Sequence, residues 1–124
     1  MTTTPRILLT GVILELTLAT AIIHFTLGGT LFLLNAAGYV ALGAAYLAAA
    51  IVPVPAVRRF GWLSRAGLAA FASVTIVAYL VIGPYFTLGW VTKGIELAIV
   101  LLVIADLIIR TDGGSATRLP PRSA

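Results

Sequence analysis

The segment Thr30–Val52 reads TLFLLNAAGYVALGAAYLAAAIV and contains no charged residue. Such a segment is typical of a helix that crosses a lipid bilayer, because about 20 apolar residues span the hydrocarbon core. Many of its residues are alanine or glycine, which allow neighbouring membrane helices to approach closely. The segment therefore predicts a membrane-spanning helix against which other helices pack.

Three further apolar stretches accompany this segment, and together they predict four membrane spans. The spans cover residues 6–24, 30–52, 65–82 and 89–110. The chain has 124 residues, of which 60% are hydrophobic and 10% charged, so no soluble domain fits in the remainder. We expect residues 1–110 to form one all-α domain, an integral membrane four-helix bundle. The Gly-, Ser-, Pro- and Arg-rich residues 111–124 should form a disordered cytoplasmic tail.

The basic residues are distributed unevenly along the chain. Seven of the eight are arginines, placed in the N-terminal tail, the second loop or the C-terminal tail: Arg6, Arg58, Arg59, Arg65, Arg110, Arg118 and Arg122. The loops Phe25–Gly29 and Gly83–Leu88 carry no formal charge, and Lys93 alone lies on their side. Cytoplasmic loops collect Lys and Arg, so we predict that both termini are cytoplasmic and both hairpins face outward. Orientation explains the net charge of +4, and we expect no nucleic-acid partner.

The composition also limits the chemistry of the protein. No cysteine is present, which excludes disulfides, thiolate metal sites and cysteine nucleophiles. The single histidine excludes a two-histidine metal or haem site within one protomer. There is no Gly-rich phosphate loop, no His-Glu-x-x-His pair and no nucleophile elbow. We therefore expect neither a metal nor a cofactor.

One short motif occurs twice. Phe25-Thr26-Leu27-Gly28 recurs as Phe86-Thr87-Leu88-Gly89, 61 residues later, and the same offset matches Asn35 with Glu96. A repeat of two spans preserves orientation in the membrane, so a duplication would give two parallel two-helix halves. Chance in so biased a composition is the alternative explanation.

Polar residues within the predicted spans gather toward the outer end. An ionisable group inside a membrane is costly and is usually functional. Glu15 lies deepest, ~14 Å from the outer end of its span at the rise of an α-helix. The candidate proton-binding or ligand-binding residues are Glu15, Glu96, Asn35, Tyr39, Tyr79, Lys93 and His24. They predict a polar pocket that opens outward and narrows to Glu15.

Each ionisable candidate has a structural alternative. Glu15 could exchange a proton or could lock helices together through a hydrogen bond. Glu96 could belong to the pocket or form only an intrahelical pair with Lys93. His24 could shuttle a proton or simply end its helix. Glu15 lies about 200° around the helix from Thr17, which shares a stripe with His24, so Glu15 and His24 should not be directly bonded.

Two further patterns concern the second and fourth spans. Asn35, Tyr39 and Tyr46 fall along one stripe of the second span, and buried tyrosines need hydrogen-bond partners. Asp106 and Arg110 have the spacing of a structural ion pair near the inner boundary.

Two resemblances add to this interpretation. The runs His24–Gly28, Leu33–Tyr39 and Gly89–Glu96 resemble small bacterial four-span proteins without an assigned function, which implies a bacterial plasma membrane. Glu15, halfway along the first of four spans, resembles the glutamate of the small multidrug resistance transporters. The aromatic and glycine signature in the third region of those transporters has no counterpart here, so the likeness is one of architecture.

Three functions remain open from the sequence. The first is a bundle that binds or transports a small or lipophilic molecule, with Glu15 and Glu96 exchanging protons. The second is an accessory subunit that packs against a partner membrane protein or a second copy. The third, and the least favoured, is a small membrane enzyme that performs acid–base chemistry on a lipid-like substrate through Glu15, Glu96 or His24.

Overall fold

The computed structural model describes residues 3–116 and the side chains of residues 4–110. This part of the chain is helical and contains no strand, so the predicted all-α class is confirmed. The helices are α1 (Thr3–Leu27), α2 (Thr30–Ile51), α3 (Pro55–Arg59), α4 (Gly61–Ile82) and α5 (Thr87–Ala116).

Glycine and proline set the boundaries of the helices. The turn between α1 and α2 uses Gly28 at φ +67° and Gly29 at φ +82°, a conformation that residues with a Cβ rarely adopt. Helix α2 ends before Pro53, which has no N–H to continue the helical hydrogen bonds. Helix α3 begins with Pro55, whose fixed φ suits the first position of a helix.

Three helices extend beyond the predicted spans, and α1 does so by three residues at each end. Helix α4 begins at Gly61 rather than at residue 65, and its first turn includes a Leu63 N–H bonded to the Phe60 carbonyl. Helix α5 continues past residue 110 to Ala116, because each residue added to a formed helix gains a hydrogen bond. The expected disordered tail is therefore helical at its start, and residues 117–124 lie outside the described part of the chain.

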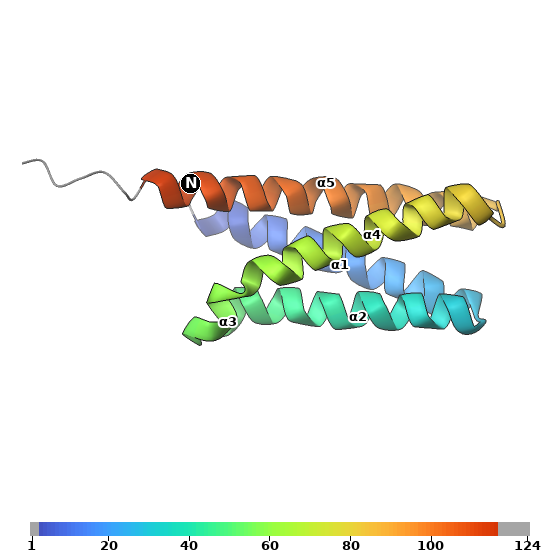
Figure 1. The fold of residues 1–124 in the computed structure, drawn as a ribbon, viewed down its shortest axis with the longest axis horizontal. Helices are drawn as coiled ribbons and strands as arrows, with labels where there is room; N and C mark the ends of the chain where they lie inside the picture. Colours follow the sequence, from blue (N-terminus) through green and yellow to red (C-terminus); the bar gives the residue numbers. More distant parts are fainter. Residues whose placement is uncertain (1–2, 117–124) are drawn as a thin grey trace, which may run out of the picture.

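Each long helix packs against two neighbours. Helix α1 contacts α2 and α5, and α4 also contacts α2 and α5, so α2 and α5 face each other across the centre. Figure 1 shows the α1–α2 and α4–α5 turns at one end, called here the hairpin end, and α3 at the other, called here the α3 end. Small residues permit this packing, since a Cβ on Gly38 of α2 would lie 2.4 Å from Cζ of Phe71 on α4.

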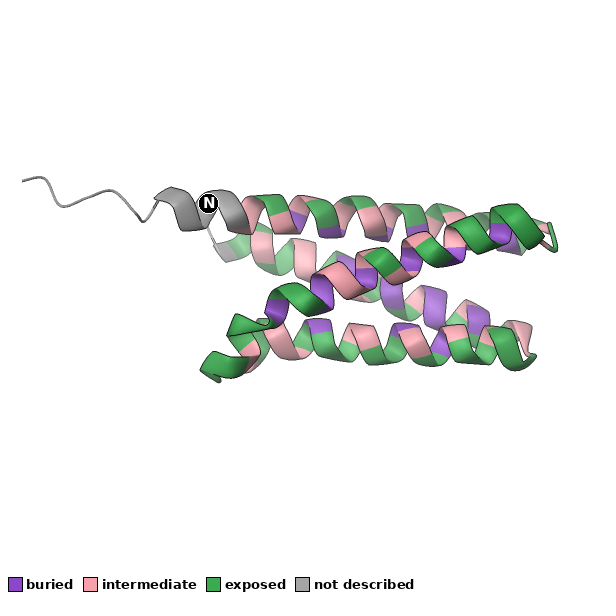
Figure 2. Ribbon diagram, viewed as in Figure 1, coloured by how far each residue is buried: buried purple, intermediate pink, exposed green. Residues whose placement is uncertain are grey.

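Several polar and charged residues are buried, whereas many large apolar residues are exposed. Figure 2 colours the ribbon by this burial. Glu96 and Asp106 are both 0% exposed, whereas Leu8, Leu34 and Val81 are each more than 60% exposed. Helices α1, α2 and α4 are long and apolar enough to cross a membrane. Buried carboxylates inside an apolar exterior suit a lipid environment. Together with the three long apolar helices, they indicate a membrane-embedded protein.

The two copies of the repeated motif differ in local structure. Gly28 of the first copy lies in a turn at positive φ, whereas Gly89 of the second lies within α5. The two copies therefore occupy different positions in their hairpins, and duplication stays a prediction.

Candidate functional site

A cluster of polar side chains around Glu96 lies near the hairpin end; we call it the hairpin-end cluster. The Glu96 carboxylate is completely buried and is approached from three helices. The Tyr39 hydroxyl of α2 donates to Glu96 Oε1 at 2.8 Å, and the Lys93 ammonium donates to Oε2 from the preceding turn of α5. His24 of α1 brings Nε2 to 3.7 Å from Oε1. Glu96 therefore does not form only an intrahelical pair with Lys93, because it also contacts side chains of α1 and α2.

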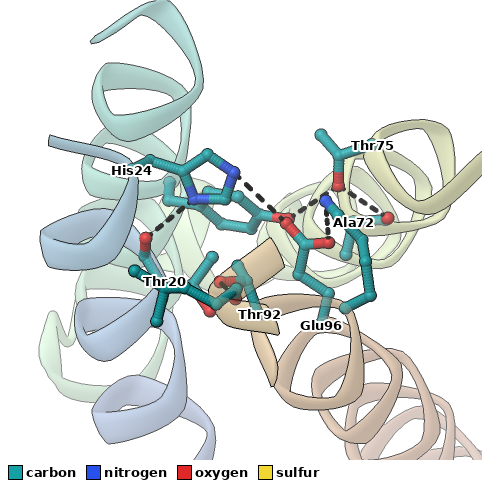
Figure 3. A network of polar contacts seen from close by, with 9 residues as sticks. Thr20, His24, Ala72, Thr75, Thr92 and Glu96 are labelled. Atoms are coloured by element: carbon teal, nitrogen blue, oxygen red, sulfur yellow. Dashed lines mark hydrogen bonds and ion pairs between the residues drawn. The ribbon is translucent and has the colours of Figure 1, made fainter. Parts of the chain in front are cut away.

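The orientation of His24 fixes which ring nitrogen carries a proton. Nδ1 lies 2.8 Å from the Thr20 carbonyl oxygen, which can only accept a hydrogen bond, so Nδ1 must be the donor. In a neutral ring Nε2 is then an acceptor, and it faces the carboxylate oxygen Oε1 of Glu96. At 3.7 Å the two atoms lie beyond hydrogen-bond distance, so His24 and Glu96 meet without a direct hydrogen bond. Figure 3 shows this approach of His24 to Glu96.

A row of hydroxyl contacts continues from Glu96 into α4. Tyr39 lies 2.8 Å from Glu96 and 3.0 Å from Thr75 Oγ1, and Thr75 lies 2.9 Å from the Ala72 carbonyl oxygen. The Tyr39 hydroxyl therefore links the Glu96 carboxylate of α5 to Thr75 of α4.

A cavity of about 270 Å³ lies beside this cluster. Its walls are mainly apolar and aromatic and include Phe32, Phe71 and Phe86. The polar residues that line it are His24, Asn35, Thr75, Tyr79, Thr92 and Lys93. Two of these, His24 and Lys93, also contact the Glu96 carboxylate. A molecule in the cavity would therefore be one side chain away from Glu96.

Tyr79 is held rigidly in the cavity wall. Its hydroxyl accepts a hydrogen bond from the Phe86 N–H at 3.1 Å and donates to the Phe86 carbonyl at 3.2 Å, which ties α4 to the start of α5. The Lys93 ammonium lies 5.4 Å from the centre of the Tyr79 ring, within the range of a cation–π contact. A hydrogen atom is the only substituent that fits at Gly89, since a Cβ there would lie 2.5 Å from the Tyr79 oxygen.

The structure does not bring Glu15 into this site. Glu15 is exposed on α1, lines neither cavity, and has no hydrogen bond or ion pair within the described residues. Thr17, about 200° away around the helix, is the residue that is buried. The cavity therefore does not narrow to Glu15 as expected, because depth in a span does not determine which face a residue occupies.

A second buried carboxylate, Asp106, forms a cluster nearer the α3 end; we call it the α3-end cluster. Asp106 Oδ2 accepts hydrogen bonds from the Tyr46 hydroxyl at 2.6 Å and from Arg65 Nε at 2.9 Å. Arg110 Nε lies 3.0 Å from Oδ1, the ion pair that the spacing predicts. The Arg65 guanidinium also lies over the Tyr46 ring, 5.4 Å from its centre.

The role of Arg65 was not foreseen from the sequence. The sequence places it at the boundary of the third span, but in the structure it lies one turn inside α4 and is only 6% exposed. The sequence did contain one signal for the two clusters, namely the stripe of α2 that carries Tyr39 and Tyr46. Both tyrosines reach a buried carboxylate of α5, one in each cluster.

The two clusters differ in what they can do. Asp106 is shared by two guanidinium groups, which remain charged at all physiological pH values, so this cluster holds helices together. The hairpin-end cluster combines a carboxylate with a histidine and can therefore exchange a proton. In the part of the chain that the structure describes, no three His, Asp or Glu side chains gather as metal ligands. Comparison with protein-family models, curated proteins and solved structures finds no match, so function must be argued from these clusters.

Proposed function

We propose that the protein is a four-span membrane protein whose hairpin-end cavity binds a small lipophilic molecule, and that binding is coupled to a proton held between His24 and Glu96. Helix α5 is the fourth span in this proposal. Its ionisable residues Glu96 and Asp106 point inward to partners, which makes a membrane location tolerable.

The proposed topology has the α3 end in the cytoplasm of a bacterial cell and the hairpin end outside the plasma membrane. The support is the distribution of charge over the helices. The arginines of the described part belong to the α3 end, whereas Lys93 is near the hairpin end. Positively charged residues are concentrated on the cytoplasmic side of membrane proteins.

The observation that carries the proton coupling is the approach of His24 Nε2 to Glu96 Oε1, 3.7 Å apart, with Nδ1 committed to the Thr20 carbonyl. A proton bound at Nε2 of His24 would face the Glu96 carboxylate directly. Lys93 and Tyr39 contact the same carboxylate. A ligand that displaces the Lys93 ammonium would change the charge at Glu96, and the bound proton would respond.

The nature of the ligand follows from the cavity. Aromatic and aliphatic walls favour a lipophilic body, while Asn35, Thr75 and Lys93 can orient one polar group.

The test compares two glutamate substitutions by native mass spectrometry of protein extracted from its own membrane in mild detergent. Glu96→Gln should reduce a stoichiometric non-protein mass at least tenfold. Glu15→Gln is the matched control, because it makes the same chemical change outside the cavity, and it should retain that mass. Equal retention in both variants, or a bare native chain, would contradict ligand binding at this site.

The proton is tested separately by infrared spectroscopy across a pH titration. A carboxyl band that titrates in the native protein and in Glu15→Gln should be missing in Glu96→Gln. Its persistence in Glu96→Gln would exclude Glu96 as the proton-binding group.

We also propose an accessory role in a larger assembly as a second candidate, on the basis of Glu15. A carboxyl group exposed midway along a membrane helix would face hydrocarbon, unless another polypeptide covers it. Native mass spectra should then show a second copy or a partner chain, and Glu15→Leu should weaken that association. A monomer in both cases would rule out this role.

A further inference from the structure

A second and larger cavity, of about 1040 Å³, lies at the α3 end; we call it the α3-end cavity. All the long helices and α3 contribute to it. Its charged lining residues are all arginines: Arg6 of α1, Arg58 and Arg59 of α3, Arg65 of α4 and Arg110 of α5. The charge therefore comes from four separate helices that meet at one place.

These arginines are not neutralised by the described part of the chain. Asp106 pairs with Arg65 and Arg110 and is the one described carboxylate in contact with the group. Five guanidinium groups thus face one carboxylate, an excess of four positive charges. Crowding of like charges in a partly enclosed space is unfavourable unless an anion binds there.

Arg6 gives an independent indication of a missing partner. Its Nε is buried and has no hydrogen-bond acceptor within the described residues. A buried donor without an acceptor costs free energy, because it has lost its hydrogen bond to water. An anion in the cavity would supply the acceptor. Arg58 and Arg59 are exposed, and neither forms an ion pair with a described residue, so both could bind the same anion.

The remaining lining residues indicate that the anion carries an apolar portion. Ile7, Leu14, Leu47 and Leu107 line the cavity together with the indole of Trp62. Arginine binds phosphate through paired N–H donors, and basic pockets between membrane helices bind lipid phosphate groups. These arginines also fit a cytoplasmic location, but guanidinium groups from α1, α4 and α5 around one space additionally provide donors for a single anion.

We propose that the α3-end cavity binds the phosphate group of an anionic phospholipid. The acyl chains lie against the apolar lining residues, and the phosphate contacts Arg6, Arg58 and Arg59, while Asp106 keeps Arg65 and Arg110 in position. This site is separate from the hairpin-end cavity, and it does not depend on the function proposed there.

The first experiment counts lipids retained by the full chain in a neutral detergent, by native mass spectrometry. Phosphatidylglycerol should be retained in preference to phosphatidylcholine. Arg58→Gln with Arg59→Gln should weaken retention about 25-fold, at about fivefold for each arginine removed. The double variant Arg118→Gln with Arg122→Gln removes the same charge from residues outside the described part, and it should retain phosphatidylglycerol as the native chain does. Equal retention of the two lipids, or equal loss in both double variants, would overturn the proposal.

Inorganic phosphate distinguishes the source of the phosphate group. Failure of millimolar phosphate to displace phosphatidylglycerol supports a lipid ligand. Complete displacement, with no preference between the two lipids, would overturn the lipid ligand and leave a site for free phosphate.

A second measurement needs no arginine substitution. The chain contains two tryptophans, so Trp90→Phe leaves Trp62 in the α3-end cavity as the only one. In nanodiscs, phosphatidylglycerol with brominated acyl chains should quench Trp62 fluorescence at least twice as strongly as brominated phosphatidylcholine. Equal quenching would contradict a bound anionic lipid.

Discussion

The Tyr39 hydroxyl on α2 donates a hydrogen bond to Glu96 on α5 across 2.8 Å, although α2 and α5 do not pack directly against each other. Two turns further along α2, Tyr46 donates to Asp106 in the same way. The phenol rings span the centre of the protein between helices on opposite sides. The interior is therefore joined by two tyrosine–carboxylate links, one in each cluster.

Removing either link should destabilise the protein. Tyr39→Phe and Tyr46→Phe each leave a buried carboxylate with one donor fewer, and we expect a loss of about 1–2 kcal/mol, as for other hydrogen bonds between membrane helices. Reversible unfolding in mixed micelles measures the change. Tyr85→Phe is the control, because Tyr85 is exposed and its hydroxyl bonds only to the Leu80 carbonyl. A stability loss in Tyr85→Phe equal to that in the two buried variants would contradict this account.

Asp106→Asn should have a larger effect than either tyrosine substitution. It removes the negative charge from two guanidinium groups, one of which, Arg65, is only 6% exposed. Breaking a buried ion pair from one side costs about 3–5 kcal/mol. The same unfolding measurement should show this loss.

The double variant Asp106→Asn with Arg65→Gln tests the cause of that loss. Removing the unpaired charge should restore part of the stability. A double variant less stable than Asp106→Asn alone would mean that packing, rather than the unpaired charge, determines the cost.

The sequence predicted the helices better than it predicted the interior. Long apolar stretches separated by glycine and proline define helices whatever their neighbours are, so Thr30–Val52 was located to within one residue of α2. Helix ends were less well predicted. Arg65 was assigned to a boundary because charge normally marks one, yet Asp106 on another helix pairs with it inside the protein. That pairing depends on tertiary contact and has no local signal.

The difference between local sequence signals and tertiary contacts also explains how well the candidate site was predicted. His24, Lys93 and Glu96 were all assigned to the outer part of their spans, and the structure brings them together. Glu15 shows the limit of this reasoning, because a residue in the middle of a span can face either the interior or the lipid. Its spacing from Thr17 distinguished the two faces, but only the packing of α1 against α2 and α5 determines which face is inward.

Two glycines of α5 offer a matched pair for the cavity wall. A Cβ on Gly89 would lie 2.5 Å from the Tyr79 oxygen and 2.8 Å from its ring, whereas a Cβ on Gly94 would meet nothing within 4 Å. Gly89→Ala should therefore displace Tyr79 and cost about 1–3 kcal/mol. Gly94→Ala should stabilise the helix by about 0.5–1 kcal/mol. Unfolding of both variants, with near-ultraviolet dichroism to report on the tyrosine, measures the contrast; equal effects would show that Tyr79 is not held against Gly89.

His24→Asn separates the two roles of the histidine. The asparagine amide can still donate to the Thr20 carbonyl, as Nδ1 does, but it has no counterpart of Nε2 facing Glu96. We expect the variant to fold with less than 1 kcal/mol lost, while the titration of the Glu96 carboxyl band moves in pH, because the second proton-binding group is gone. Infrared titration of His24→Asn measures this, with the Glu96 band identified as the carboxyl band that is lost on adding Glu96→Gln. An unchanged titration would mean that the 3.7 Å approach of His24 to Glu96 is a packing contact and that Glu96 binds its proton without the histidine.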